Sequence, residues 1–152
     1  GTAKAISVGL LQQGIASLTV VNRSNDNATN LIAPLKDRFL SCHFDIFSPQ
    51  NDVLIEHLKS MDMVINTTPL GMAPLQDVLP LPSMNWVGSH HLCYDVIYNP
   101  AESLFLKEAK ERGANVVNGL AMLAAQASFA FKIFTGKNAS FEMMFSEAKK
   151  YV

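Results

Sequence analysis

The chain has 152 residues, of which 49% are hydrophobic, so it is long enough to bury one sizeable core in a single globular domain. Its formal net charge of -1 argues against nucleic acid or an anionic membrane surface as the main partner. No apolar run approaches the roughly 20 residues of a membrane span, and no secretory signal peptide is visible, so we expect a cytoplasmic protein.

Strand-like runs rich in Val, Ile, Tyr and Phe alternate with helical patterns along the chain. The predicted helices cover 2–13, 25–38, 51–60, 101–112, 119–135 and 140–150, and the predicted strands cover 17–23, 42–47, 62–68, 92–98 and 115–119. Because the strands are apolar on both faces, this alternation predicts an α/β fold with helices covering a parallel sheet. The irregular segment 70–91 contains three prolines, and we expect a surface loop beside a site.

The cysteine and histidine residues do not indicate a redox or metal site. Cys42 and Cys93 each fall in an apolar, strand-like run, which favours two buried thiols over a disulfide or redox pair. The four histidines lack the spacing of metal ligands with carboxylate or thiol partners. We therefore expect no metal site.

The end of the first strand carries "NRS" (22–24). Ligands of an open parallel sheet bind beyond the carboxyl ends of its strands, and this tripeptide lies about 20 residues after Gly1, where a dinucleotide fold meets the adenosine ribose. A neutral Asn22 followed by Arg23 suits a 2′-phosphate, and therefore NADP, better than a 2′-hydroxyl. The alternative is an ordinary helix cap at Ser24 with a solvated Arg23.

Two further segments follow later strands. In "NTTPLGM" (66–72), hydroxyls, a proline-set turn and Gly71 allow the backbone to approach a flat ligand. In "YDVIYNP" (94–100), Tyr98 and Asn99 fall at the strand end. Asp95, inside the apolar strand, needs partners such as backbone amides, and we interpret it as structural.

The segment "NGLAMLAAQASFAFKIF" (118–134) is apolar nearly all round, which predicts a buried helix. At about 100° per residue, Gly119, Met122, Leu123 and Gln126 share one face near its start. Two interpretations of Gln126 are open on this pattern: a hydrogen-bonded amide in the core, or a contact to the ligand.

Taken together, "NRS", "INTTPLGM", "YDVIYNP", "LFLKEAKERGANVVNGLAMLAAQASFAF" and the final helix resemble the shikimate dehydrogenase family. The resemblance covers essentially all 152 residues, in the right order and spacing. It implies an oxidoreductase that reversibly reduces 3-dehydroshikimate to shikimate with NADPH, in aromatic amino-acid biosynthesis. It also implies that residues 1–152 are a Rossmann-like NADP-binding domain, a doubly wound parallel sheet with helices on both faces, which follows an N-terminal substrate domain.

The resemblance assigns roles to particular residues. Tyr98 and Gln126 match substrate contacts, with Tyr98 also near the nicotinamide. The residues that match cofactor contacts are Gly1, Thr2 and Ala3 at the end of the glycine-rich loop; Asn22, Arg23 and Ser24 at the 2′-phosphate; Thr67, Thr68, Pro69, Leu70 and Met72 beside the ribose and nicotinamide; and Gly119 and Met122 at the nicotinamide.

The chain departs from the family pattern in two ways. Many members carry a second basic residue shortly after the Asn-Arg-Ser/Thr motif, whereas "NDN" (25–27) supplies Asp26. The family's catalytic Lys–Asp pair lies in the N-terminal domain, so we expect no catalytic residue in this chain, and Lys4, Lys107 and Lys110 do not replace that lysine. We also expect the first, central strand of the sheet to precede Gly1, and the 152 residues alone to be inactive.

Two other functions are compatible with these motifs. One is a quinate/shikimate dehydrogenase that uses NAD, and the other is a non-catalytic nucleotide-binding module derived from the family. The partners that we expect are the substrate, the N-terminal domain of the same protein and, as a further possibility, a second copy in a homodimer.

Overall fold

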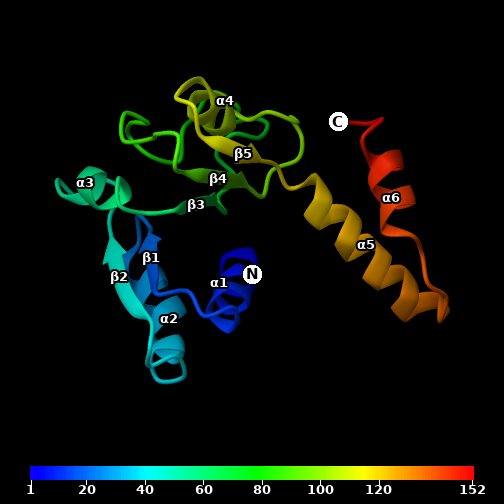
Figure 1. Cartoon of the computed structure of the whole chain (residues 1–152), viewed down its shortest axis with the longest axis horizontal. Coiled ribbons are helices and arrows are strands. Elements are labelled where there is room, and N and C mark those ends of the chain that lie inside the picture. Colours follow the sequence, from blue (N-terminus) through cyan, green and yellow to red (C-terminus); the bar gives the residue numbers. More distant parts are fainter. The chain divides into compact units, whose positions relative to one another are not determined.

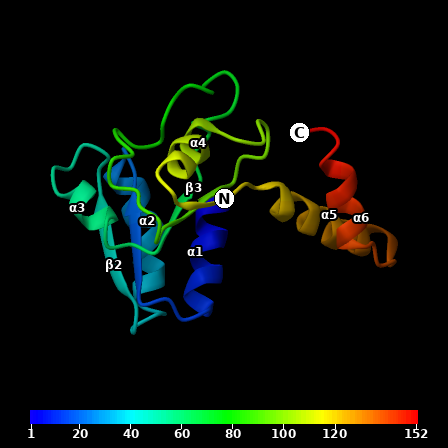
Figure 2. The ribbon, with the colours of Figure 1, turned by 45° about the horizontal axis from the view of Figure 1, so that its top comes forward.

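A computed structural model describes all of residues 1–152, and the chain divides into two compact units, Gly1–Leu58 and Lys59–Val152. Figures 1 and 2 show the helices and strands of each unit. No helix combines the length and the apolar character needed to cross a membrane.

The first unit is built around two parallel strands. Its elements are α1 (Thr2–Gln12), β1 (Ser17–Val21), α2 (Asn25–Lys36), β2 (His43–Phe47) and α3 (Leu54–Leu58). α2 packs against both strands (Figure 2). Its buried residues Ala28, Ile32 and Leu35 recur at helical spacing, which places them on one face of the helix. Pairing of β1 with β2 sets Ser17 opposite His43.

The second unit is built around three parallel strands. Its elements are β3 (Met63–Asn66), β4 (Leu92–Asp95), α4 (Leu104–Glu111), β5 (Asn115–Val117), α5 (Leu120–Thr135) and α6 (Phe141–Ala148). β4 is the central strand, and α4 packs against β4 and β5 through the buried side chains of Phe105, Leu106 and Ala109. Ser103 caps α4, which is why this helix begins three residues later than its apolar pattern predicts.

Every strand pairing is parallel, as strands apolar on both faces predict. The neighbours are β1-β2 in one sheet and β3-β4-β5 in the other. A doubly wound sheet of order 3-2-1-4-5-6 has these same neighbours once its strand 1 is left out. The predicted α/β class with parallel strands is therefore confirmed.

The segment between β3 and β4 is only partly the surface loop that its prolines predict. In its first half, residues 72–78 are exposed, whereas Gly71 is buried. Its second half contributes Met84 and Trp86 to the core, and the Trp86 indole N–H donates to the carbonyl of Ser83 at 2.8 Å. The second half of this segment is therefore part of the core, although its backbone is irregular.

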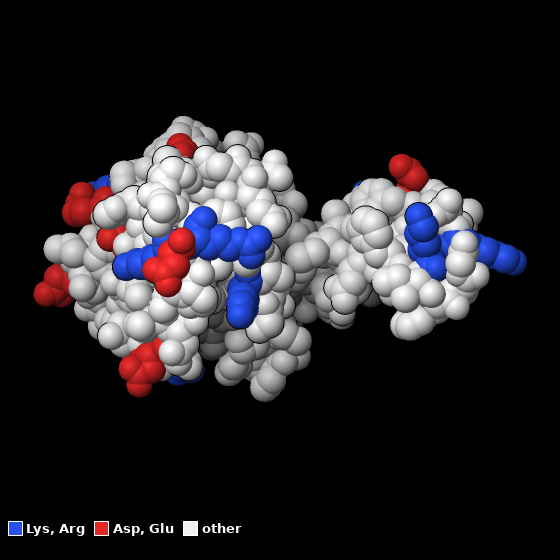
Figure 3. Space-filling view, turned by 90° about the horizontal axis from the view of Figure 1, so that it is seen from below, with Lys and Arg blue, Asp and Glu red and all other residues white.

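The prediction that the helix after β5 is buried is wrong for most of its length. In α5, only Leu120 and Ala124 are buried, whereas Phe129 is 69% exposed, Ile133 is 79% exposed and Phe134 is 84% exposed. α6 packs against α5, yet no residue of α6 is buried. Figure 3 shows a mostly uncharged surface over these two helices, interrupted by a few charged side chains. Apolar composition indicates that α5 avoids water, but α6 covers only part of it.

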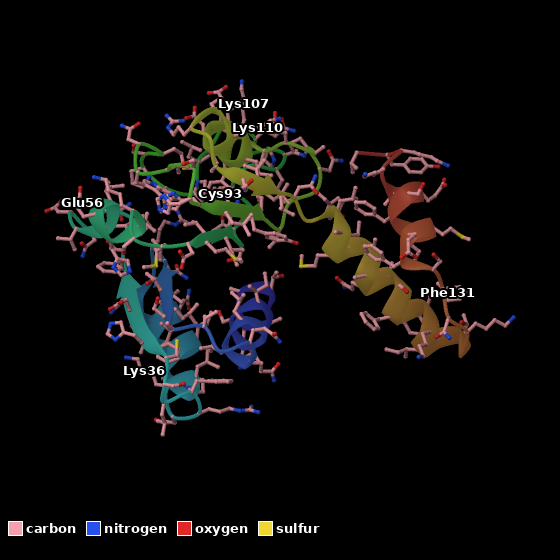
Figure 4. The ribbon with its side chains drawn as sticks, in the orientation of Figure 1. Lys36, Glu56, Cys93, Lys107, Lys110 and Phe131 are labelled. Atoms are coloured by element: carbon pink, nitrogen blue, oxygen red, sulfur yellow. The ribbon has the colours of Figure 1, made fainter.

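The two cysteines are free thiols in unlike environments. Cys93 lies on β4 (Figure 4), is fully buried, and burial raises the pKa of its thiol to about 11. Cys42 precedes β2 instead of lying within it, and it is only half-buried, contrary to the prediction of two buried strand thiols. Because Cys42 lies in the turn before β2, the elements that pack on the faces of the sheet do not cover it completely.

Candidate functional site

The carboxyl end of β1 presents an arginine beside a capped helix. The backbone N–H of Asn22 donates to the carbonyl of Phe47 at 3.1 Å, and its side-chain oxygen accepts the N–H of Ser24 at 3.1 Å. The Ser24 hydroxyl then accepts the N–H of Asn27 at 3.3 Å, at the first turn of α2. Arg23 is exposed and takes part in no ion pair. Its guanidinium, beside a helix N-terminus, is therefore available to an anion such as phosphate.

The start of α1 has no side-chain cap. Gly1 is the N-cap and offers no side-chain hydrogen bond, so the N–H groups of Thr2 and Ala3 in the first turn have no side-chain cap. Lys4 follows them and is exposed. These groups lie in the first unit, together with Asn22, Arg23 and Ser24.

In the second unit, a hydrogen-bonded turn follows β3. The side-chain oxygen of Asn66 accepts the backbone N–H of Thr68 at 3.0 Å and its hydroxyl at 2.7 Å. The same Thr68 hydroxyl oxygen accepts the N–H of Leu70 at 3.2 Å, and the Asn66 amide donates to the carbonyl of Leu70 at 3.0 Å. These bonds close the predicted cofactor segment 67–72 into a defined turn at the carboxyl edge of the sheet.

The side chain of Asp95 binds this turn through Asn66. Its fully buried carboxylate accepts the Ser103 hydroxyl at 2.6 Å, the backbone N–H of Ile97 at 3.0 Å and the Asn66 amide at 3.2 Å from each oxygen. Desolvation raises the pKa of Asp95, and the hydrogen bonds from Ser103, Ile97 and Asn66 oppose that rise. The prediction that Asp95 is structural and has a backbone amide among its partners agrees with these bonds.

The ends of β4 and β5 meet at a glycine. The N–H of Gly119 donates to the carbonyl of Ile97 at 3.0 Å, and a Cβ built on Gly119 would lie only 2.0 Å from the carbonyl oxygen of Val96. Only a residue without a side chain permits this approach. Gly119 is also the N-cap of α5, so the backbone contact sets where that helix starts.

The remaining predicted site residues of the second unit are accessible to a ligand. Tyr98 lies three residues beyond the end of β4 and is 39% exposed, so it is not at the strand end itself. Met122 is half-buried and Gln126 is exposed on α5. The interpretation of Gln126 as a core amide is therefore wrong, and its contact to a ligand stays a prediction.

Asn66 and Ser103 are the residues of this site that sequence reasoning did not single out. Asn66 is the last residue of β3 and directly precedes the Thr-Thr-Pro turn, and Ser103 stands one residue before an amphipathic helix. A polar residue at each of these positions is a local signal for an Asx turn and an N-cap. Nothing local indicates that both side chains meet Asp95.

No group of three or more His, Cys, Asp or Glu side chains is arranged to hold a metal ion. Of the lysines on α4 (Figure 4), Lys110 pairs with Glu102 at 2.8 Å, and this partner raises the pKa of the lysine. Lys107 is exposed on the same helix. Neither side chain hydrogen-bonds to Asp95, and Lys107 meets its partner Ser103 only through the backbone, where its N–H donates to the Ser103 carbonyl at 2.9 Å.

Comparison with known proteins identifies what this chain is similar to. It is 41% identical to a shikimate dehydrogenase (NADP(+)) of Methanosphaera stadtmanae over 143 residues, which are 93% of this chain and 50% of that enzyme. It is 33% identical to a shikimate dehydrogenase (NADP(+)) of Desulforamulus reducens over all of this chain and 52% of that enzyme. The chain thus spans about half the length of the curated relatives it matches. No protein-family model matches it.

Solved structures agree with these relatives. A shikimate 5-dehydrogenase from Listeria monocytogenes, in complex with shikimate and NAD, matches 95% of this chain and 51% of its own, with a TM-score of 0.85 and 26% identity. A quinate dehydrogenase from Corynebacterium glutamicum, in complex with NAD, shares the fold with a TM-score of 0.86 over all of this chain and 52% of its own, at 24% identity. The resemblance to shikimate dehydrogenases that the motifs predict is confirmed over about half of those enzymes.

Proposed function

We propose that this chain is the cofactor-binding part of an NADP-dependent shikimate dehydrogenase, which reversibly reduces 3-dehydroshikimate to shikimate. The observation that carries the proposal is the 41% identity, over 93% of the chain, to a curated shikimate dehydrogenase (NADP(+)). The turns that follow β3, β4 and β5 support it, because they contain the residues that match the family's cofactor contacts.

The residues present fit an NADP molecule. The exposed Arg23 guanidinium beside the N-terminus of α2 suits a 2′-phosphate, since a planar donor binds phosphate oxygens in pairs. Gly119 is buried against the Val96 carbonyl, so its contribution to the proposed nicotinamide site is the position that it gives to the start of α5. When bound, the nicotinamide exchanges a hydride with the substrate carbon. Binding and orienting that cofactor, and contacting a substrate hydroxyl through Gln126, are the tasks of this chain.

We further propose that residues 1–152 are one domain of a two-domain protein, whose N-terminal substrate domain carries the acid–base residues. Two observations support this: the chain spans about half of its relatives, and α5 exposes Phe129, Ile133 and Phe134. Apolar side chains this exposed on one helix are typical of an interface. A second copy of the protein is the alternative occupant of this surface. We place the protein in the cytoplasm, where two free thiols stay reduced.

The test is turnover by the complete product of the gene that encodes this chain. We expect shikimate-dependent formation of NADPH, followed by its absorbance, with a higher kcat/KM for NADP+ than for NAD+. A preference for NAD+ with quinate would favour the quinate/shikimate dehydrogenase alternative. Binding of NADP+ without turnover of either substrate would favour a non-catalytic module. The matched control is the 152-residue chain alone, for which we expect no turnover.

A further inference from the structure

We propose that Asp95 and Ser103 are positioning residues that set the shape of the turns through which the second unit contacts NADP. This inference rests on the proposed function, because the contacts of these turns to the cofactor come from it. Neither residue matches a cofactor contact of the family. Both are buried, so they act through their neighbours.

Asp95 helps to orient the Asn66 side chain, which organises the turn after β3. An ionised carboxylate only accepts, so Asn66 must turn its NH2 group toward Asp95. Its oxygen then faces Thr68 and accepts both the backbone N–H and the hydroxyl of that residue. Having donated its proton, the Thr68 hydroxyl accepts the N–H of Leu70. A flip of the Asn66 amide would set its oxygen against the Asp95 carboxylate and the Leu70 carbonyl, and its NH2 group against the N–H of Thr68. Asp95 therefore acts together with these two backbone groups to hold one arrangement of the turn.

A second set of bonds runs from Asp95 to the ends of β4 and β5. The carboxylate accepts the N–H of Ile97, and the carbonyl of Ile97 accepts the N–H of Gly119. Tyr98 is the next residue along the chain. The three predicted nicotinamide-side segments, at 67–72, at Tyr98 and at Gly119, are therefore each tied to one carboxylate through one neighbouring residue.

Ser103 holds that carboxylate in place from α4. Its hydroxyl donates to Asp95 at 2.6 Å, the shortest of the bonds to this carboxylate, and it accepts the N–H of Leu106 as the cap of α4. Gly71 of the turn lies next to it with no room for a side chain: a Cβ built there would lie 3.2 Å from the Ser103 Cβ, and the φ of +110° at Gly71 favours glycine. Ser103 thus lies beside Gly71 of the turn and is linked to the turn through Asp95.

The chain offers a matched pair of variants to separate this role from helix capping. Ser103 and Ser140 each cap a helix of eight residues, and each hydroxyl accepts the N–H three residues later. Ser103→Ala and Ser140→Ala therefore both lose a cap, but only Ser103→Ala loses a bond to Asp95. In the complete gene product, we expect Ser103→Ala to raise the Kd for NADP+ about tenfold, or about 1.4 kcal/mol, and Ser140→Ala to leave it within about twofold.

Asp95→Asn is the second variant, used if Ser103→Ala does not fold. It keeps the shape of the side chain but sets a donor against the NH2 of Asn66, so we again expect about a tenfold rise in the Kd for NADP+. Hydrogen exchange of the free protein gives a readout that needs no cofactor. We expect the amides of Thr68 and Leu70 to exchange at least about tenfold faster in Ser103→Ala than in Ser140→Ala.

The outcomes separate this inference from the proposed function. Failure of the unsubstituted protein to bind NADP+ would overturn both. NADP+ binding by the unsubstituted protein, with an unchanged Kd in Ser103→Ala or Asp95→Asn, would overturn the positioning role alone. Equal exchange rates at Thr68 and Leu70 in the two serine variants would also overturn it, because the turn would then be independent of the bond to Asp95.

Discussion

Replacing Gly119 by alanine tests the contact between the ends of β4 and β5. The added Cβ would lie 2.0 Å from the Val96 carbonyl oxygen and 2.6 Å from its carbonyl carbon. An ordinary contact begins near 3.4 Å, so α5 or the backbone at Val96 must move by about 1.4 Å. The bond from the Gly119 N–H to Ile97 cannot keep its 3.0 Å length through such a shift.

The expected loss of stability in Gly119→Ala follows from two costs. Overpacking of a fixed site costs about 1–3 kcal/mol, and loss of one backbone hydrogen bond costs about 1 kcal/mol. The φ of -75° at Gly119 is one that alanine adopts freely, so the lost freedom of the unfolded chain offsets about 0.5–1 kcal/mol of these costs. We therefore expect Gly119→Ala to lower the free energy of unfolding by about 1–3 kcal/mol. With an m-value of about 2 kcal/mol/M, the urea midpoint falls by about 0.5–1.5 M.

The control is Gly9→Ala, in the interior of α1, where an added Cβ meets no atom within 4 Å. This change removes backbone freedom from the unfolded chain and should raise stability by about 0.5–1 kcal/mol. Both variants are measured in the complete gene product by circular dichroism in urea. A midpoint for Gly119→Ala equal to or above that of the unsubstituted protein would refute the close approach.

Three further substitutions test separate parts of the site. Arg23→Ala should raise the KM for NADP+ by about 10- to 100-fold through loss of a charge-assisted contact, and it should change the KM for NAD+ little. An unchanged ratio of the KM values for NADP+ and NAD+ would contradict the assignment of Arg23 to the 2′-phosphate. Gln126→Ala should raise the KM for shikimate or lower kcat by about one or two orders of magnitude, because a contact to the substrate worth about 1–3 kcal/mol is lost. Unchanged kinetics would show that Gln126 is not part of the substrate site. For Cys93, the folded pKa of about 11 exceeds the ordinary value of 9.0, so thiolate formation favours the unfolded chain. Stability should therefore fall as the pH rises from 9 toward 11, and less so in Cys93→Ala; equal pH profiles of the thermal midpoint would count against the burial of this thiol.

Much of the fold follows from local patterns in the sequence. Each of the five apolar runs forms a strand, and each helical pattern forms a helix, because burial of apolar side chains with a period of two or 3.6 is a local property. The limits of the elements are less well determined. The pattern over 51–60 yields only α3, Leu54–Leu58, because nothing in the apolar spacing marks where the helix begins and ends.

Tertiary structure alone decided what each side chain meets. Asp95 needed partners, but Asn66 lies 29 residues away in the chain and Ser103 eight, and only parallel pairing of β3 with β4 and the return of α4 bring them together. The apolar character of α5 was plain in the sequence, whereas its exposure was not, because composition does not say which element covers a helix. The sequence by itself determined which residues avoid water and which turns follow the strands; the contacts that give those turns one shape arise only when the strands are side by side.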